Sequence, residues 1–152
     1  MKSGHKFQIL IVHGPNLNLL GEREPEVYGS ITLSQLNAKI EDYLEAKNCS
    51  GIFFQSNHEG IIIDFLHDHR KTADGVIINP GALTHYSYAL HDALKGILLP
   101  AVEVHLSDIQ SREDFRKISV TRPACIDQIS GLGADSYLRG IDFLIEELYK
   151  RI

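Results

Sequence analysis

With 152 residues, 43% of them hydrophobic and 23% charged, the chain has the proportions of one ordinary globular domain, so we expect a single domain over residues 1–152 with one core. Its formal net charge of −5 comes from 15 lysines and arginines against 20 aspartates and glutamates, with no dense basic run; this excludes the usual electrostatic footprint of a nucleic-acid binder. No stretch approaches the ~18 apolar residues of a membrane span, so neither a nucleic acid nor a membrane is an expected partner.

Short runs rich in β-branched residues alternate along the chain with segments of helical period. This alternation is typical of a parallel sheet that is covered by helices on both faces. The expected strands occupy residues 7–13, 51–55, 76–79, 101–105 and 124–129. We therefore predict an α/β fold with a five-stranded parallel sheet in the order 2-1-3-4-5, in which the first, third and fourth strands end side by side.

Capping residues indicate where the helices begin. Two helix starts have the spacing of a capping box, at Thr32 with Gln35 and at Ser56 with Glu59. Thr84 is expected to cap the third helix, which ends near Gly96. A short helix is expected around residues 112–117, and the closing helix over residues 134–149.

The residues that follow three of the strands are chemically unusual. They are residues 13–16 (His-Gly-Pro-Asn), 79–82 (Asn-Pro-Gly-Ala) and 103–107 (Glu-Val-His-Leu-Ser). Folds of this kind bind ligands outside the carboxyl ends of their strands, where the strand order reverses. The connection that runs from residue 13 to residue 31 is also longer than the usual ~2–6 residues, as lids and binding loops are. These features predict a site at this edge of the sheet.

The long loop sets Arg23 five residues before Tyr28, between flexible glycines. A phenol is ordinarily half ionised only near pH ~10, so it acts as a base near neutrality only where cations stabilise its anion. Arg23, together with Arg112 from beyond the fourth strand, could supply that stabilisation in a closed site. The alternative interpretation is a solvated acidic loop with one anchoring aromatic residue.

On the fourth strand, the two-residue period places Glu103 and His105 on the same face. A carboxylate beside an imidazole fixes the tautomer of the ring and favours its charged form, which suits a general acid. The alternative is a surface ion pair at the end of a strand. The backbone N–H groups of Leu106 and Ser107 leave the sheet just before a helix start, where anions bind readily.

Other polar residues have less specific patterns. Arg112 and Arg116 are expected one turn apart on a shared helix face. Asn16 and Asn79 each follow a strand beside proline and glycine, which ordinary turn chemistry also explains. Residues 67–69 (His-Asp-His) point to different sides of a helix, so no metal site is expected.

Two further patterns are interpreted as structural. The segment from Gly131 to Gly133 lacks the following strand that a dinucleotide-binding unit requires, so we expect a tight turn. Cys49 and Cys125 lie far apart in the sequence and have no metal-binding or redox spacing, which favours reduced thiols in a cytoplasmic protein. The apolar run from Ile9 to Val12 is too short for the core of a signal peptide.

Several of these segments together resemble the type II 3-dehydroquinate dehydratase family, nearly end to end. They are residues 14–21 (Gly-Pro-Asn-Leu-Asn-Leu-Leu-Gly), 23–25 (Arg-Glu-Pro), 28–29 (Tyr-Gly), 79–82 and 103–107. The resemblance implies a flavodoxin-like fold, a homo-oligomer that is a dodecamer built from trimers, and a single catalytic domain that needs no cofactor. The implied activity is that of a hydro-lyase (EC 4.2.1.10): trans elimination of water from 3-dehydroquinate through an enolate, in the shikimate pathway to chorismate and the aromatic amino acids.

The resemblance also implies a role for each site residue. Tyr28 would remove the C2 proton as the base, and Arg23 would keep it ionised. Asn16 would hold a water against the enolate oxygen. His105, oriented by Glu103, would protonate the departing C1 hydroxyl. The substrate would be bound by Asn79, His85, Leu106, Ser107, Arg112, Arg116 and, from a neighbouring subunit, Asp92.

His13 is the one departure from the family pattern near the site, because many relatives carry asparagine there. The departure affects a supporting contact rather than any of the residues with an implied catalytic role. The site that the resemblance implies is otherwise complete.

Proteins of other classes could use the same architecture, so the fold alone does not decide the function. A receiver domain needs acidic residues after the first strand and a phosphorylatable aspartate after the third, and residues 13–16 and 79–81 contain neither. A flavodoxin needs a hydroxyl-rich phosphate loop after the first strand, and residues 13–16 do not provide one. A dehydratase that works through a Schiff base resembles a (β/α)₈ barrel of ~250 residues, for which this chain is too short.

Overall fold

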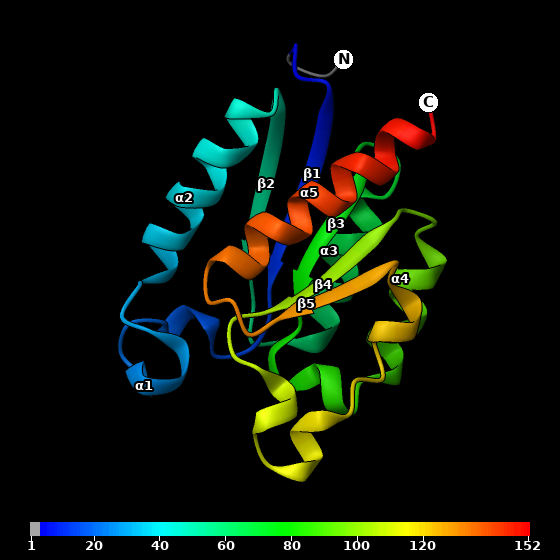
Figure 1. Cartoon of the computed structure of the whole chain (residues 1–152). Helices are drawn as coiled ribbons and strands as arrows, with labels where there is room; N and C mark the ends of the chain where they lie inside the picture. Colours follow the sequence, from blue (N-terminus) through cyan, green and yellow to red (C-terminus); the bar gives the residue numbers. More distant parts are fainter. Residues whose placement is uncertain (1–3) are drawn as a thin grey trace.

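The computed structural model of the chain describes residues 4–152 and contains a five-stranded parallel sheet in the order β2-β1-β3-β4-β5 (Figure 1). The strands are β1 (Phe7–His13), β2 (Cys49–Gln55), β3 (Gly75–Asn79), β4 (Ala101–His105) and β5 (Asp127–Ser130). All neighbouring pairs are parallel, and the register places His13 of β1 opposite Asn79 of β3. The predicted fold class and strand order are confirmed.

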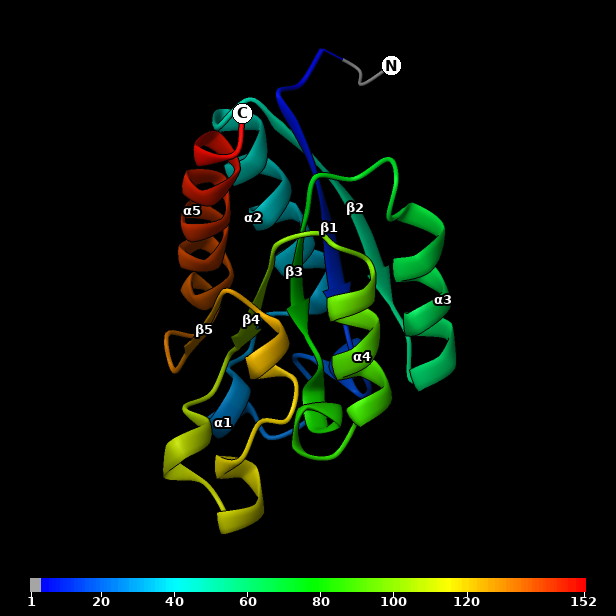
Figure 2. The same ribbon diagram turned by 90° about the vertical axis from the view of Figure 1, so that its right-hand side faces the viewer.

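Helices cover both faces of this sheet. The α-helices are α1 (Pro25–Tyr28), α2 (Leu33–Ala46), α3 (Glu59–His69), α4 (Tyr88–Gly96) and α5 (Asp135–Lys150), and the short 3-10 helices are η1 (Leu17–Leu19), η2 (Gly81–His85), η3 (Ile109–Ser111), η4 (Asp114–Lys117) and η5 (Arg122–Ala124). Helices α2 and α5 pack on one face, and α3 and α4 pack on the other (Figure 2). No helix within residues 4–152 is long and apolar enough to cross a membrane.

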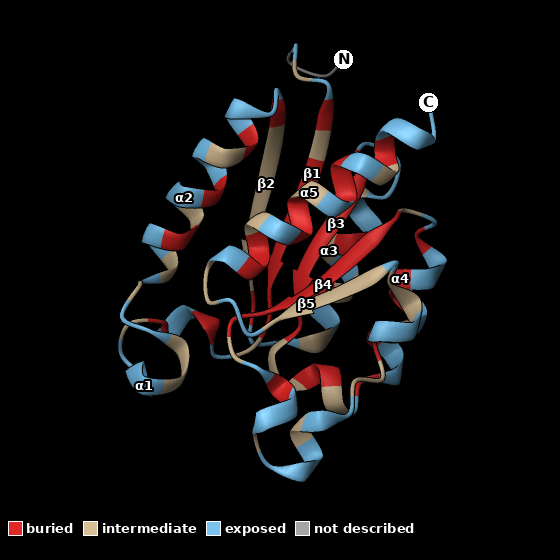
Figure 3. Cartoon of the chain, in the orientation of Figure 1, coloured by how far each residue is buried: buried red, intermediate tan, exposed pale blue. Residues whose placement is uncertain are grey.

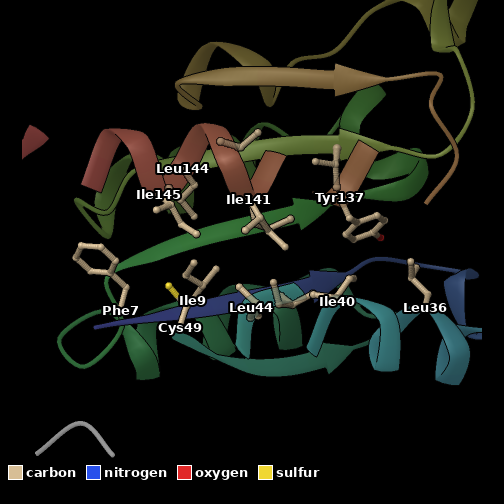
Figure 4. Close-up of a cluster of buried hydrophobic side chains, with 14 of the residues drawn as sticks. Phe7, Ile9, Leu36, Ile40, Leu44, Cys49, Tyr137, Ile141, Leu144 and Ile145 are labelled. Atoms are coloured by element: carbon tan, nitrogen blue, oxygen red, sulfur yellow. The ribbon is translucent and has the colours of Figure 1, made fainter. Parts of the chain in front are cut away.

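The core consists of two apolar layers, one on each face of the sheet. In β1, Ile9 and Ile11 join the layer under α2 and α5, whereas Leu10 and Val12 join the layer under α3 and α4. Figure 4 shows the first layer, in which the apolar faces of α2 and α5 pack against β1. Because both faces are covered, the central strands are buried along their length (Figure 3), which explains their nearly continuous apolar sequences.

A capping box starts α2, as predicted. Thr32 Oγ1 accepts a hydrogen bond from the Gln35 backbone N–H at 3.1 Å, and Gln35 Oε1 accepts one from the Thr32 N–H at 2.9 Å. The capping box predicted for Ser56 and Glu59 is wrong. Ser56 Oγ accepts from the His58 N–H at 3.0 Å, and α3 begins without a side-chain cap.

Ser87 caps α4, and the prediction that Thr84 does so is wrong. Ser87 Oγ accepts from the Leu90 N–H at 3.0 Å and donates to Glu59 of the neighbouring helix. Thr84 lies earlier, in η2, and its hydroxyl donates to the buried carboxylate of Glu103 at 2.8 Å. A buried charge must be hydrogen-bonded, and this long-range requirement decides where the Thr84 side chain points.

The region between β4 and α5 also differs from the prediction. The helix predicted around residues 112–117 is replaced by the separate 3-10 helices η3 and η4, with Arg112 between them in an extended conformation. The prediction that Arg112 and Arg116 share a helix face is therefore wrong. Residues 122–124 form η5, which has a proline in its first turn, so β5 begins only at Asp127. At the other boundaries, β2 begins at residue 49 rather than 51 and β3 at residue 75 rather than 76.

Candidate active site

The carboxyl ends of β1, β3 and β4 lie at the edge of the sheet where α1 also lies (Figure 2). Residues at and after these strand ends line one pocket. The pocket is lined by Pro15, Asn16, Leu17, Arg23, Tyr28, Asn79, Gly81, Ala82, His85, His105, Leu106, Ser107, Ile109, Arg112 and Arg116. Of the predicted site residues, only Glu103 and Asp92 are outside this lining. Within residues 4–152, no three histidine, cysteine, aspartate or glutamate side chains are grouped so that they could hold a metal ion.

Two arginines from distant parts of the chain meet at the hydroxyl of Tyr28. Arg112 Nη1 donates to Tyr28 Oη at 2.7 Å, and Arg23 Nη2 donates to it at 3.2 Å. Both guanidinium groups also contact the ring, with distances to its centroid of 5.3 and 4.5 Å. Glu24, with a left-handed φ of 39°, and Pro25 start the one-turn helix α1 that brings Tyr28 back beside Arg23. Two cations are therefore directed at the one oxygen that would carry the charge of a phenolate.

His105 and Glu103 form a buried pair on one face of β4, while Val102 and Val104 enter the apolar layer on the other face. His105 Nε2 donates to Glu103 Oε2 at 2.7 Å. The two residues are 5% and 0% exposed, which excludes the alternative of a surface ion pair. Because Nε2 is bound to the carboxylate, Nδ1 is the ring nitrogen left to act in the pocket that His105 lines.

Glu103 is surrounded by hydrogen-bond donors. Besides His105, the donors are Thr84, Ser119 and Gln128, which bind Oε2 at 2.8, 2.9 and 2.6 Å, and Thr121, which binds Oε1. Burial raises the pKa of Glu103, but the hydrogen bond and charge of His105, together with the other donors, outweigh burial and lower this pKa to about 2. The side chain is therefore a carboxylate at any physiological pH.

Sequence reasoning missed these four donors. They come from η2, from residues 119–121 and from β5, and no local pattern connects these segments. The one available signal was strand pairing, because Gln128 lies opposite Glu103 in the register of β5 with β4. A polar residue opposite a buried glutamate would have indicated a partner, had the start of β5 been predicted correctly.

Leu106 and Ser107 continue from β4 along the wall of the pocket. The carbonyl oxygens of Leu106 and Ser107 accept hydrogen bonds from the N–H groups of Gly133 at 3.0 Å and Gly131 at 3.1 Å. Both glycines have positive φ values, 60° and 82°, a conformation that L side chains rarely adopt. The predicted tight turn at residues 131–133 is confirmed, and it holds the backbone that follows His105.

His85 lies in η2 at the edge of the pocket. Its Nδ1 donates to the carbonyl oxygen of Ile118 at 2.7 Å. Burial is the largest influence on His85, and with the nearby positive charge of Arg116 it lowers the pKa of the ring below its usual range. In the neutral ring Nε2 is an acceptor, which suits a hydroxyl group of a ligand.

His85 and Asp92 lie in different helices, although a third helix that began after Thr84, as predicted, would have contained both. Helix α4 begins at Tyr88, so His85 precedes it in a separate 3-10 helix. The error follows from the cap, which was placed at Thr84 instead of Ser87. Asp92 is exposed on α4 and does not line the pocket of its own chain.

Asn16 and Asn79 follow β1 and β3, whose turns pack closely together. The N–H of Gly14 donates to the Asn79 carbonyl at 2.7 Å, and a Cβ on Gly14 would lie 2.5 Å from the next carbonyl oxygen of that turn. Asn79 Oδ1 accepts from the Gly81 N–H at 3.1 Å. Asn16 has a left-handed φ of 71°, and its N–H donates to Asn57 Oδ1 at 2.9 Å. The pocket wall is thus set by backbone contacts that only glycine at position 14 permits.

Comparisons with known proteins agree with this geometry. A family model described as dehydroquinase class II matches residues 7–145. The 3-dehydroquinate dehydratase of Halothermothrix orenii is 51% identical over 143 residues, which cover 94% of this chain and 97% of that protein. The 3-dehydroquinate dehydratase of Roseiflexus castenholzii is 53% identical over 139 residues, which cover 91% of this chain and 88% of that protein. The crystal structure of the type II dehydroquinase from Butyrivibrio crossotus superposes with a TM-score of 0.90 at 46% identity, covering 91% of this chain and 97% of that one. The chain therefore belongs to the class II dehydroquinase family.

Proposed function

We propose that this chain removes water from 3-dehydroquinate to give 3-dehydroshikimate, as a type II 3-dehydroquinate dehydratase of the shikimate pathway, and that the pocket at Tyr28 is its active site. A β-hydroxy ketone that loses water through an enolate needs a base, a group that stabilises the enolate and an acid. The observation that carries the proposal is the meeting of two arginines at the Tyr28 oxygen, in the pocket that His105 also lines. The names of the relatives support the same activity.

In this proposal Tyr28 is the base. Its phenolate takes a proton from C2 of the substrate, and Arg23 and Arg112 stabilise the phenolate before the transfer. The electrons of the C2–H bond move toward the C3 carbonyl, whose oxygen becomes an enolate. Asn16, at the pocket wall, holds a water against this oxygen, and the charge of Arg23 stabilises the transition state.

His105 is the acid in the second half of the reaction. Its Nδ1 gives a proton to the C1 hydroxyl, which leaves as water while the C1–C2 double bond forms. Glu103 stabilises the imidazolium form and fixes the hydrogen on Nε2. Because the pKa of Glu103 is held at about 2, the carboxylate keeps its charge and does not compete for the proton.

The remaining residues of the pocket bind the substrate. The backbone amides of Leu106 and Ser107, with the side chain of Asn79, bind its carboxylate. His85 accepts a hydrogen bond from a ring hydroxyl through Nε2. Arg116 contacts the ring hydroxyls, and Arg112 adds positive charge beside the bound anion. All of these residues line the one pocket.

Adding 3-dehydroquinate to the purified protein tests the proposal. We expect a rise in ultraviolet absorbance from the conjugated enone of the product. Sodium borohydride added together with the substrate is expected to leave the protein mass unchanged, because no lysine is among the residues that line the pocket. Absence of the enone, or a covalent adduct after borohydride treatment, would contradict the proposal.

We also propose that the site is completed between subunits, in a dodecamer built from trimers. Asp92 faces solvent on α4, outside the pocket of its own chain. Tyr88, one helical turn earlier on the same face, is 69% exposed, and Tyr86 is 62% exposed. Large exposed aromatic side chains are typical of contact surfaces. In the assembly, Asp92 would reach the substrate hydroxyls in a neighbouring pocket.

Mixed oligomers test this shared site. Asp92→Ala and Tyr28→Phe subunits are each expected to be strongly impaired alone, and to regain about a quarter of wild-type activity when co-refolded in equal amounts, because a quarter of random interfaces pair an intact Tyr28 with an intact Asp92. Activity is measured by the enone absorbance, and mixing is verified by native mass spectrometry.

The control for this experiment replaces the Tyr28→Phe partner with the double variant Tyr28→Phe/Asp92→Ala. This mixture contains no intact Asp92, so no recovery is expected. The shared site is refuted if verified mixed oligomers of the single variants are no more active than their parents, or if Asp92→Ala alone has normal activity.

The cellular location that we propose is the cytoplasm. Cys49 and Cys125 are free thiols, and burial raises the pKa of both above the usual range. Unpaired, unreactive thiols are typical of proteins that work in a reducing compartment.

A further inference from the structure

The hydrogen-bond donors around Glu103 are divided unequally between its two carboxylate oxygens. Oε1 accepts from Thr121. Oε2 accepts from His105 Nε2 at 2.7 Å and from three further donors, which are Gln128 Nε2 at 2.6 Å, Thr84 Oγ1 at 2.8 Å and Ser119 Oγ at 2.9 Å. A buried carboxylate needs donors, but its charge alone does not require that most of them bind the oxygen that also binds the imidazole.

The donors to Oε2 are themselves held by backbone contacts. Gln128 lies opposite Glu103 in the register of β5 with β4. Thr84 lies in η2, and its carbonyl oxygen accepts from the Val120 N–H at 2.7 Å. The carbonyl oxygen of Val120 in turn accepts from His91 Nδ1 of α4, also at 2.7 Å. Oε2 is therefore bound from β5 on one strand edge and from a loop that is fastened to η2 and α4.

The hydrogens available limit which of these donors hold Oε2 at all times. Each hydroxyl has one hydrogen. Ser119 Oγ accepts from the Arg122 N–H at 2.9 Å and lies 2.7 Å from Thr84 Oγ1, so its hydrogen can go to Glu103 or to Thr84. The amide of Gln128 has two hydrogens on Nε2 and binds Oε2 at the shortest of the four distances. Thr84 and Gln128 are therefore the two donors that best define the position of Oε2.

We propose that Thr84 and Gln128 are positioning residues for the proton transfer from His105, and that they act by holding Glu103 Oε2 in place. The inference rests on the proposed function, in which His105 Nδ1 protonates the departing hydroxyl. A carboxylate with free oxygens can turn about its last bond, and the imidazole bound to it then turns as well. With Oε2 fixed, the ring keeps one tautomer and one direction. Neither Thr84 nor Gln128 lines the pocket, so their effect on the reaction passes through Glu103 and His105.

Thr84→Val and Gln128→Met test the proposal from two different elements. The first variant keeps the branched shape of the side chain without the hydroxyl, and the second keeps the length of the side chain without the amide. We expect each to lower kcat for 3-dehydroquinate about tenfold and to leave KM within about twofold, because the direction of a proton donor matters in the transition state and not in substrate binding. Thr84→Ser, which keeps the hydroxyl, is expected to restore kcat to near the wild-type value.

A His105→Ala background shows whether the effect passes through His105. There, Thr84→Val and Gln128→Met are expected to lower the residual kcat no further, because no imidazole remains to be oriented. The matched control is Tyr43→Phe, which removes another hydroxyl that donates to a carboxylate, that of Asp142 at 2.6 Å, away from the pocket. Its kcat and KM are expected to equal those of wild type. Circular dichroism and a thermal melt verify that each variant is folded.

The proposal is overturned if a folded Thr84→Val or Gln128→Met variant keeps the wild-type kcat, raises KM alone, or loses the same factor in kcat in the His105→Ala background as in wild type. If Thr84→Val does not fold, Gln128→Met, at a partly buried position of β5, decides by the same outcomes. A wild-type protein without activity on 3-dehydroquinate, or a normal kcat in His105→Ala, would instead contradict the proposed function, so the two failures are distinguishable.

Discussion

Replacement of Tyr28 by phenylalanine is expected to lower kcat for 3-dehydroquinate by about 10²- to 10⁴-fold, the usual contribution of a positioned acid or base. The variant keeps the ring over which Arg23 and Arg112 lie and removes the oxygen that both arginines bind. Affinity for the product is expected to change little, because in the proposal that oxygen takes a proton from the substrate but makes none of the contacts that bind it. Steady-state kinetics and calorimetric titration with 3-dehydroshikimate measure the two effects.

Tyr149→Phe is the control for loss of a tyrosine hydroxyl elsewhere in the molecule. Tyr149 is half exposed near the end of α5, where its ring packs edge-on against Phe7 at a centroid distance of 5.0 Å, and it does not line the pocket. Its kinetics are expected to match those of wild type. Near-normal turnover of Tyr28→Phe would remove Tyr28 from the role of base.

Replacement of His105 by alanine is expected to lower kcat by a similar factor of about 10²- to 10⁴-fold, with a much smaller change in KM. The hydroxyl of C1 then has no positioned proton donor when it leaves. Glu103 loses one donor but keeps the bonds from Thr84, Ser119, Thr121 and Gln128. The buried charge therefore remains hydrogen-bonded, and the variant is expected to fold.

His67→Ala, on the exposed surface of α3, is the control for the loss of a histidine and should leave both kinetic constants unchanged. If the effect of His105→Ala is confined to KM, His105 binds the substrate and another group supplies the proton. Circular dichroism and a thermal melt separate this result from a folding defect.

Local patterns in the sequence were sufficient to predict the architecture and the place of the site. A parallel strand that is covered on both faces is apolar throughout, whereas a helix repeats every 3.6 residues, so the order of the elements could be predicted. Parallel strands end at one edge of the sheet, which is why Asn16, Asn79 and His105 could be expected near one another. The Thr32 capping box was also predictable, because both of its hydrogen bonds lie within four residues.

The neighbours of Glu103 illustrate what local patterns do not contain. Thr84 has the sequence context of a helix cap, yet its hydroxyl binds Glu103 nineteen residues away. Arg112 and Arg116 have helical spacing, yet the chain is extended at Arg112, whose guanidinium group binds Tyr28.

By itself, the sequence determined the fold class and the edge of the sheet at which polar residues gather, because short-range periodicity gives the succession of strands and helices, and the carboxyl ends of parallel strands share one edge. Only the tertiary structure decided the partners of the buried polar groups, namely the donors around Glu103 and the hydrogen bonds of His13 with Asn37 and Tyr137. A buried polar group must be hydrogen-bonded by whatever the fold brings near it, and its partner can come from any distance along the chain.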